Sequence, residues 1–246
     1  MSATTTTTTA TKPERPAPAP IDLLDNDIAR VYTHIHPLLL LSLFYFRFDA
    51  LVANPVQTLL SSLVPLALLQ IAYCVLCLPP TTGSSSPQAK VAGKKGKSGK
   101  GKDELGIVNR MIPAVYALLL TAFFGLPVLT IGLILFGAPL TTHTPHTVLA
   151  AAHMAYLAAI PLVYVHGVDA GRWMDLASLS LPVDEVLGGA LGVLMGAWGG
   201  AVPVPLDWDR DWQAWPITIV TGAYIGYTVG KFAGGVLFKG KRIEFN

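Results

Sequence analysis

The chain has 246 residues, of which 52% are hydrophobic and only 13% are charged, and its mean hydropathy is positive. Soluble domains carry about 25% charged residues, so this composition excludes an ordinary soluble domain and predicts a polytopic membrane protein. The net charge of +2 is small, and the placement of the charges along the chain is more informative than their sum.

The first 30 residues form a polar tail. A threonine run, residues 4–9, is followed by four closely spaced prolines. Such a segment cannot bury a core, so we expect residues 1–30 to be disordered. The tail does not read as a signal peptide, because three aspartates precede the first apolar run.

Apolar segments long enough to cross about 30 Å of hydrocarbon recur along the rest of the chain. They predict six transmembrane helices, with the approximate bounds 31–52, 55–78, 108–136, 147–166, 183–202 and 215–238. The first is the weakest, because Arg47 and Asp49 lie near its far end, so five spans are the alternative. These two side chains are expected to neutralise each other, or Arg47 to meet an anionic headgroup. The third segment is interrupted by Pro127. The predicted fold class is therefore all-α, with residues 31–246 forming one six-helix transmembrane domain.

Two cysteines, Cys74 and Cys77, form a CxxC pair inside the second predicted helix. A thioredoxin-like redox motif needs a soluble βαβ context, and a zinc site needs more ligands than two thiols. We therefore interpret the pair as two small apolar residues of a membrane helix.

Basic residues set the expected orientation. A loop rich in Gly, Ser and Lys, residues 79–106, lies between the second and third predicted helices. With six spans it shares a side with both termini, while Arg47 and Arg210 are the only basic residues on the opposite side. The positive-inside rule then places both termini and the loop in the cytosol, and residues 203–216 on the lumenal or external side. We interpret the loop as a solvated linker in preference to a site for anionic lipid.

The fifth and sixth predicted helices carry glycine at every fourth position. The two series are Gly188, Gly192, Gly196 and Gly200, and Gly222, Gly226, Gly230 and Gly234. Each series covers about 18 Å on one face of its helix, at about 1.5 Å per residue. Small residues let helix backbones approach closely in lipid, so both stripes predict helix packing. Two arrangements remain open: the stripes face each other and close a helical hairpin, or at least one faces a separate membrane protein.

Ionisable residues inside the predicted helices give no reactive cluster. Lys231 lies about two turns from the end of the last predicted helix and is expected to snorkel to the headgroups. His143, His146 and His153 begin the fourth predicted helix without nearby carboxylates, which helical metal sites usually have. We expect these histidines at headgroup depth, and we predict neither a metal site nor a cofactor.

Acidic residues around the loop between the fourth and fifth predicted helices suggest a phosphotransfer site with a divalent ion. Asp169 and Asp175 are too loosely spaced to form a motif. Asp184 and Glu185 are better explained as anions in the first turn of the fifth predicted helix.

The segment from Pro203 to Pro216 is polar and rich in tryptophan. Its candidate partner- or lipid-contact residues are Asp207, Trp208, Asp209, Arg210, Trp212 and Trp215. Tryptophan rings suit the headgroup layer, so an interfacial belt on a rigid turn is one interpretation. The other is a platform that docks a lumenal domain or a lipid headgroup.

This segment and the helix before it resemble the signature of the PIG-F family. The similar stretch is residues 196–216, GAWGGAVPVPLDWDRDWQAWP, leading to Gly222, and residues 137–139 and the fourth predicted helix are also similar. The resemblance covers residues 31 to 246 without the lysine-rich loop, and it does not include the threonine tail. The family usually has proline where this chain has Asp211, which makes the turn less rigid here.

The resemblance implies a function that the residues alone do not. PIG-F proteins are small polytopic proteins of the endoplasmic reticulum that act in glycosylphosphatidylinositol (GPI) anchor synthesis. They are non-catalytic subunits that stabilise large ethanolamine-phosphate transferases of the PIG-O and PIG-G type. Those partners move phosphoethanolamine onto mannoses of the GPI precursor. The expected contacts are therefore these transferases and membrane lipids, with no nucleic acid. A stand-alone lipid-handling enzyme or flippase-like protein is the alternative, and a solute transporter is disfavoured because inverted repeats are absent.

Overall fold

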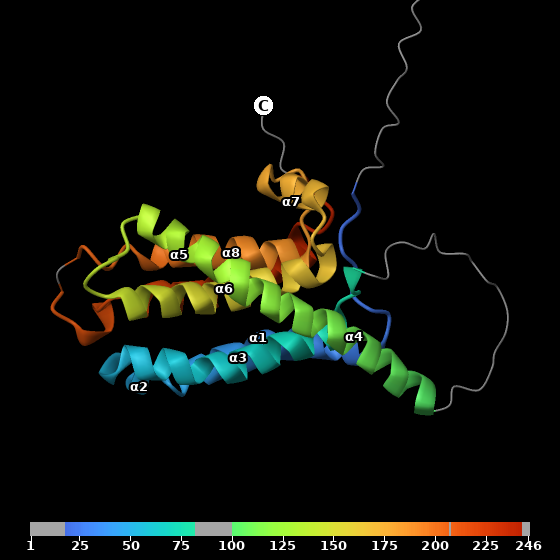
Figure 1. The fold of residues 1–246 in the computed structure, drawn as a ribbon, viewed down its shortest axis with the longest axis horizontal. Coiled ribbons are helices and arrows are strands. Elements are labelled where there is room, and N and C mark those ends of the chain that lie inside the picture. The colour runs from blue at the N-terminus through green and yellow to red at the C-terminus, as the bar shows by residue number, and fades with distance from the viewer. Residues whose placement is uncertain (1–17, 82–99, 207, 243–246) are drawn as a thin grey trace, which may run out of the picture.

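The computed structural model describes residues 18–81, 100–206 and 208–242, and these residues are helical with no β-strand (Figure 1). The predicted all-α class is thereby confirmed. The α-helices are α1 Asp27–Tyr45, α2 Phe48–Ala53, α3 Pro55–Cys77, α4 Lys100–Leu120, α5 Leu126–Leu135, α6 Thr144–His166, α7 Ala170–Ala177, α8 Glu185–Gly200 and α9 Ile217–Phe232. Two π-helical turns, η2 Thr121–Gly125 and η4 Ala233–Leu237, continue α4 and α9, and η3 Asp211–Gln213 is a 3₁₀ turn. The threonine run and most of the lysine-rich loop lie outside the described residues.

The helices form a bundle with α6 at its centre (Figure 1). Helix α6 packs against α3, α4, α5, α8 and α9, and 72% of its most apolar stretch is buried. By contrast, only 6% of the corresponding stretch of the continuous helix Gly106–Leu135 is buried. That helix therefore lies at the edge of the bundle, with most of its circumference free of neighbours among the described residues.

Short local features set where the first helices begin and end. The Asn26 side chain accepts a hydrogen bond of 2.6 Å from the Ala29 N–H and caps α1. Asn54 caps α3 in the same way, with Pro55 in the first turn, where a missing N–H costs nothing. Between them the chain breaks at Phe46 and Arg47, so the first predicted span is two helices rather than one.

The predicted interruption at Pro127 takes the form of the π-helical turn η2. A proline ring in a regular α-helix clashes with the carbonyl four residues earlier, here that of Phe123, and removes one hydrogen bond. The wider turn over Thr121–Gly125 lies at this point and lets the helix continue into α5.

Three helices among the described residues are long and apolar enough to cross a membrane: Pro55–Cys77, Gly106–Leu135 and Thr144–His166. Helix α8 has 16 residues, or about 24 Å at about 1.5 Å per residue, which is short for a bilayer core, whereas α9 continues through η4 to Leu237. The protein is therefore a helical membrane protein, and the number of six spans stays a prediction.

The described residues nearest the two termini lie together at one end of the bundle. Arg242 donates a hydrogen bond of 3.1 Å to the Pro18 carbonyl, and Lys239 forms an ion pair of 2.7 Å with Asp22. The N–H of Ile21 also bonds to the Asp184 carboxylate at 2.9 Å. These contacts order residues 18–30, the part of the expected disordered tail that the structure describes.

Candidate functional site

The two glycine stripes face each other along the antiparallel pair α8 and α9. A Cβ atom built on Gly192 would lie 2.1 Å from the Gly226 carbonyl oxygen, and one on Gly196 would lie 2.1 Å from that of Gly222. Gly188 and Gly230 oppose each other in the same way. Real Cβ contacts are never this short, so only glycine allows this backbone approach. The first of the two predicted arrangements, a closed helical hairpin, is the one that the structure adopts.

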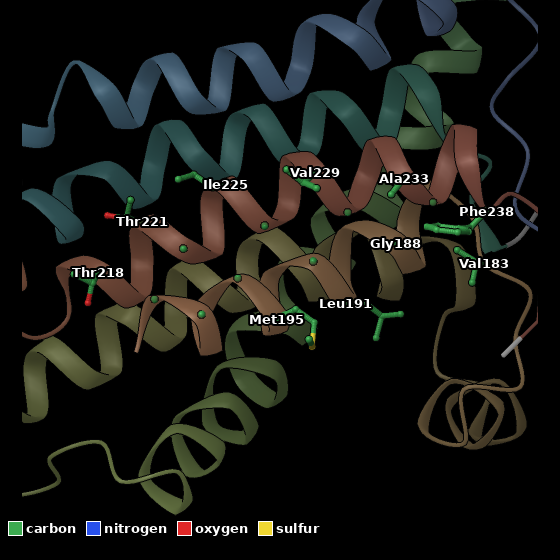
Figure 2. A pocket seen from close by; sticks show the side chains of 18 of the residues that line it. Val183, Gly188, Leu191, Met195, Thr218, Thr221, Ile225, Val229, Ala233 and Phe238 are labelled. Atoms are coloured by element: carbon green, nitrogen blue, oxygen red, sulfur yellow. The ribbon is translucent and has the colours of Figure 1, made fainter. Parts of the chain in front are cut away.

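An apolar groove with a volume of about 990 Å³ runs along this seam on the outer side of the hairpin (Figure 2). All eight stripe glycines line it, and larger apolar side chains stand beside them: Leu191, Met195, Ile225 and Val229. Met195 and Val229 are each more than half exposed, because nothing among the described residues covers the groove. We call this feature the α8/α9 groove.

The two ends of the α8/α9 groove differ in chemistry. Pro203, Trp212 and Thr218 line one end, next to the tryptophan-rich turn. Thr218 is only 7% exposed, and its Oγ1 has no hydrogen-bond partner among the described residues. Lys241 and Arg242, the last two residues that the structure describes, line the opposite end. The α8/α9 groove is thus apolar along its length and has two cations at one end.

The sequence predicted the stripes but not the side chains that flank them. Each flanking residue follows a stripe glycine by three positions, as Leu191 follows Gly188 and Val229 follows Gly226. Residues three apart share a helix face, so this offset is the signal that identifies the walls of the groove.

The tryptophan-rich turn brings together only some of its predicted contact residues. The rings of Trp208 and Trp212 lie 5.9 Å apart, and Trp208 is 53% exposed. Asp209 and Arg210 are exposed on the same turn. Trp215 points elsewhere, and its Nε1–H donates a hydrogen bond of 3.2 Å to Thr147 at the start of α6. Asp207 lies outside the described residues.

One side chain holds the turn in shape. Gln213 donates from Nε2 to the carbonyl oxygens of Pro203, at 2.9 Å, and Leu206, while its Oε1 accepts from the Arg210 N–H at 3.2 Å. These bonds satisfy backbone groups that no helix or strand pairs, so the turn has a defined shape despite Asp211 replacing the expected proline.

Lys231 is buried and ion-paired, so the expectation that it snorkels is wrong. It is 3% exposed, and its Nζ lies 3.0 Å from Oε1 of Glu185. Glu185 also accepts a hydrogen bond from Thr33 on α1. The Lys231 ammonium lies 3.5 Å from the centre of the Tyr73 ring and 3.4 Å from Nδ1 of His36. This buried cluster connects α1, α3, α8 and α9.

Asp184, next to that cluster, has a capping role. Its Oδ1 accepts hydrogen bonds from the backbone N–H groups of Val186 and Leu187 at the start of α8. The predicted role for Asp184 as an anion at this helix start is confirmed, whereas Glu185 additionally neutralises Lys231.

The histidines divide into two environments. His143 is exposed and its ring lies 5.2 Å from that of His146. His153 is buried instead of lying at headgroup depth, with Nε2 3.0 Å from the Leu59 carbonyl and Nδ1 2.9 Å from the Tyr224 hydroxyl. A carbonyl oxygen only accepts, so Nε2 donates and Nδ1 accepts from Tyr224. His153 therefore joins α3, α6 and α9 as a core residue.

The remaining candidates have structural contacts. Asp169 caps α7 by accepting bonds from the backbone N–H groups of Gly171 and Arg172. Arg47 donates a hydrogen bond of 2.5 Å to the Ser61 hydroxyl, and no ion pair joins it to Asp49. Both cysteines are free thiols with no exposed surface. In the described parts of the chain, no three His, Cys, Asp or Glu side chains gather as metal ligands would.

Comparison with known proteins gives the family. The sequence profile of the GPI biosynthesis protein family Pig-F matches residues 35–235. Glycosylphosphatidylinositol anchor biosynthesis protein 11 of Aspergillus fumigatus is 44% identical, over 92% of this chain and 86% of its own length. The protein of the same name from Neurospora crassa is 45% identical, over 87% of this chain and 77% of its own length. No solved structure matches. The predicted resemblance is confirmed: the chain belongs to the Pig-F family of GPI biosynthesis proteins.

Proposed function

We propose that this protein is a non-catalytic membrane subunit of the endoplasmic reticulum that stabilises and scaffolds the ethanolamine-phosphate transferases of GPI-anchor synthesis. Family membership supports the pathway. The observation that carries the scaffold role is the helix Gly106–Leu135, 30 residues of apolar sequence of which only 6% of the most apolar stretch is buried. A helix so little covered by its own chain presents a large surface for the transmembrane helices of a PIG-O or PIG-G type catalytic subunit.

The glycine stripes stabilise the protein itself in this proposal, rather than seating the partner. Their backbones are already in contact with each other, so a partner's helix cannot reach the glycine faces inside the seam. The partner surface is assigned to α4, η2 and α5, where Phe123 and Phe124 are 72% and 67% exposed. Aromatic side chains are frequent among the residues that dominate binding energy at protein interfaces.

Co-purification tests this assignment. The double variant Phe123→Ala/Phe124→Ala is expected to reduce co-purification of the transferase in mild detergent by about tenfold or more, as loss of about 1.4 kcal/mol or more at an interface does. The matched control is Val64→Ala/Leu68→Ala, two residues of α3 that are 66% and 62% exposed on another surface. Unchanged co-purification in the phenylalanine variant, with normal protein levels, would remove this helix as the partner surface.

A separate assay addresses catalysis. The purified chain, reconstituted alone with a phosphoethanolamine-bearing lipid and a mannose-containing acceptor, is expected to give no transfer, whereas the complex with the transferase gives product. Transfer by the chain alone would replace the scaffold role with the stand-alone enzyme.

A further inference from the structure

We propose that the α8/α9 groove binds one anionic phospholipid, with an acyl chain lying along the glycine seam and the phosphate between Lys241 and Arg242. This proposal does not depend on the scaffold role. It rests on the shape of the groove, the position of the two cations and the pairing of the charges around them.

The groove has the shape and lining that a hydrocarbon chain requires. Its volume of about 990 Å³ lies on the outer surface of a helix pair that packs alongside α6, one of the helices long and apolar enough to cross a membrane (Figures 1 and 2). The floor is glycine backbone, and Met195 and Val229 stand on its two sides (Figure 2). A lining of glycine backbone and apolar side chains along the whole seam suits a flexible acyl chain, which can follow it and keep apolar contact along its length.

The two cations are held at the mouth of the groove by the backbone. The Val183 N–H donates a hydrogen bond of 2.7 Å to the Lys241 carbonyl, and the Gly240 N–H donates one of 2.8 Å to the Val183 carbonyl. Arg242 is fixed further by its bond to the Pro18 carbonyl. The C-terminal segment is therefore tied to the residues that precede α8, and this places both cations beside the groove.

Charge pairing distinguishes these two cations from their neighbours. Lys239 is paired with Asp22 and Lys231 with Glu185. Among the described side chains, no carboxylate pairs with Lys241 or Arg242, and both are exposed. Two cations that no described carboxylate pairs, at the end of an apolar groove, match a ligand that is anionic at one end and apolar along its length. An anionic phospholipid of the adjacent leaflet has this composition.

The test uses the full-length chain in nanodiscs of phosphatidylcholine and phosphatidylserine, in a molar ratio of about three to one. Phosphatidylserine is the anionic probe, and phosphatidylcholine is the lipid without net charge with which it competes. Native mass spectrometry after detergent release counts the retained lipids. The wild-type chain is expected to retain one phosphatidylserine in preference to phosphatidylcholine. Lys241→Gln/Arg242→Gln is expected to weaken that preference by about tenfold or more, since each surface cation contributes about fivefold. Lys239→Gln, whose cation is already paired, is the matched control and is expected to change it little.

A second pair of variants tests the groove itself. Val229→Trp fills the groove, whereas Val64→Trp adds the same ring to an equally exposed position of α3; the two valines are 61% and 66% exposed. Retention of phosphatidylserine is expected to fall about tenfold or more only in the first, while the thermal unfolding midpoints of both stay near that of the wild type. If Val229→Trp does not fold, Ile225→Trp replaces it, since Ile225 lines the same groove. Equal retention of the two lipids by the wild type would overturn the proposal. A photo-cross-linking amino acid in place of Ile225 is expected to capture lipid, and capture of a protein instead would also overturn it.

Discussion

At the scale of single residues, the molecule is defined by polar side chains that are buried in pairs. Lys231 and Glu185 neutralise each other, and His153 connects the Leu59 carbonyl to the Tyr224 hydroxyl. A charge or polar group that is isolated in an apolar interior costs far more than one with a partner. The cost of removing one member of a pair should therefore exceed the cost of removing both.

The ion pair gives the first prediction. Lys231→Met leaves Glu185, whose side chain is only 13% exposed, without its cation and is expected to lower the free energy of unfolding by about 3–5 kcal/mol. The double variant Glu185→Leu/Lys231→Met removes both charges and is expected to recover most of that loss. Tryptophan fluorescence during denaturation of the purified chain in mild detergent measures both values. A double variant that is less stable than the single one would show that the charges do not act as a pair.

At the scale of elements, the α8/α9 hairpin is held by backbone contact rather than by interlocking side chains. Gly192 and Gly226 approach so closely that a methyl group fits at neither position. Dispersion between two backbones at this distance replaces the hydrophobic drive that water supplies to soluble proteins.

The second prediction compares two glycines of α8. Gly192→Ala places a Cβ 2.1 Å from a carbonyl oxygen and is expected to lower the free energy of unfolding by about 1–3 kcal/mol or more. Gly199→Ala meets no atom within 4 Å and, because alanine favours helix, is expected to be neutral or slightly stabilising. Equal losses of unfolding free energy in the two variants, measured in the same detergent, would contradict the close contact between the two glycine stripes.

The sequence predicted the all-α class and the stripes, but it did not predict α7, the division of the first segment into α1 and α2, or which surfaces meet. A repeat of four identifies one face of a helix, yet it carries no information on what that face contacts. The same limit explains why the prediction that Lys231 snorkels is wrong. Its partner Glu185 is remote in sequence and becomes adjacent only through the hairpin. Arg47 and Asp49 marked the far end of the first segment as weak, but the apolar residues on both sides did not predict a break at Phe46, whereas Pro127 did predict an irregular helix.

At the scale of the whole molecule, the bundle has two chemically distinct ends. The tryptophan-rich turn, α2 and the loop before α6 lie at one end, and α7 and the described residues nearest both termini lie at the other (Figure 1). This arrangement agrees with an even number of crossings between the two termini. The number of crossings and their direction are the predictions that remain to be measured.

Thiol labelling in sealed microsomes tests the topology. The native cysteines are fully buried, so they give little background with a membrane-impermeant maleimide. Val168→Cys, at a position that is 77% exposed in the loop after α6, is expected to label in intact vesicles. Arg210→Cys, at an exposed position of the tryptophan-rich turn, is expected to label only after the membrane is permeabilised. Labelling of both positions from the same side would contradict the six-span arrangement.

The evenly spaced glycines have one further consequence. If α8 slid along α9 by four residues, about 6 Å, glycine would again meet glycine over most of the contact. The glycine repeat therefore allows close packing in more than one register and does not by itself select one of them. The pair of Lys231 and Glu185 is not repeated along the two helices, so any such slip would separate these two charges inside the bundle. A single buried pair of opposite charges thus fixes the alignment that the repeat alone leaves ambiguous.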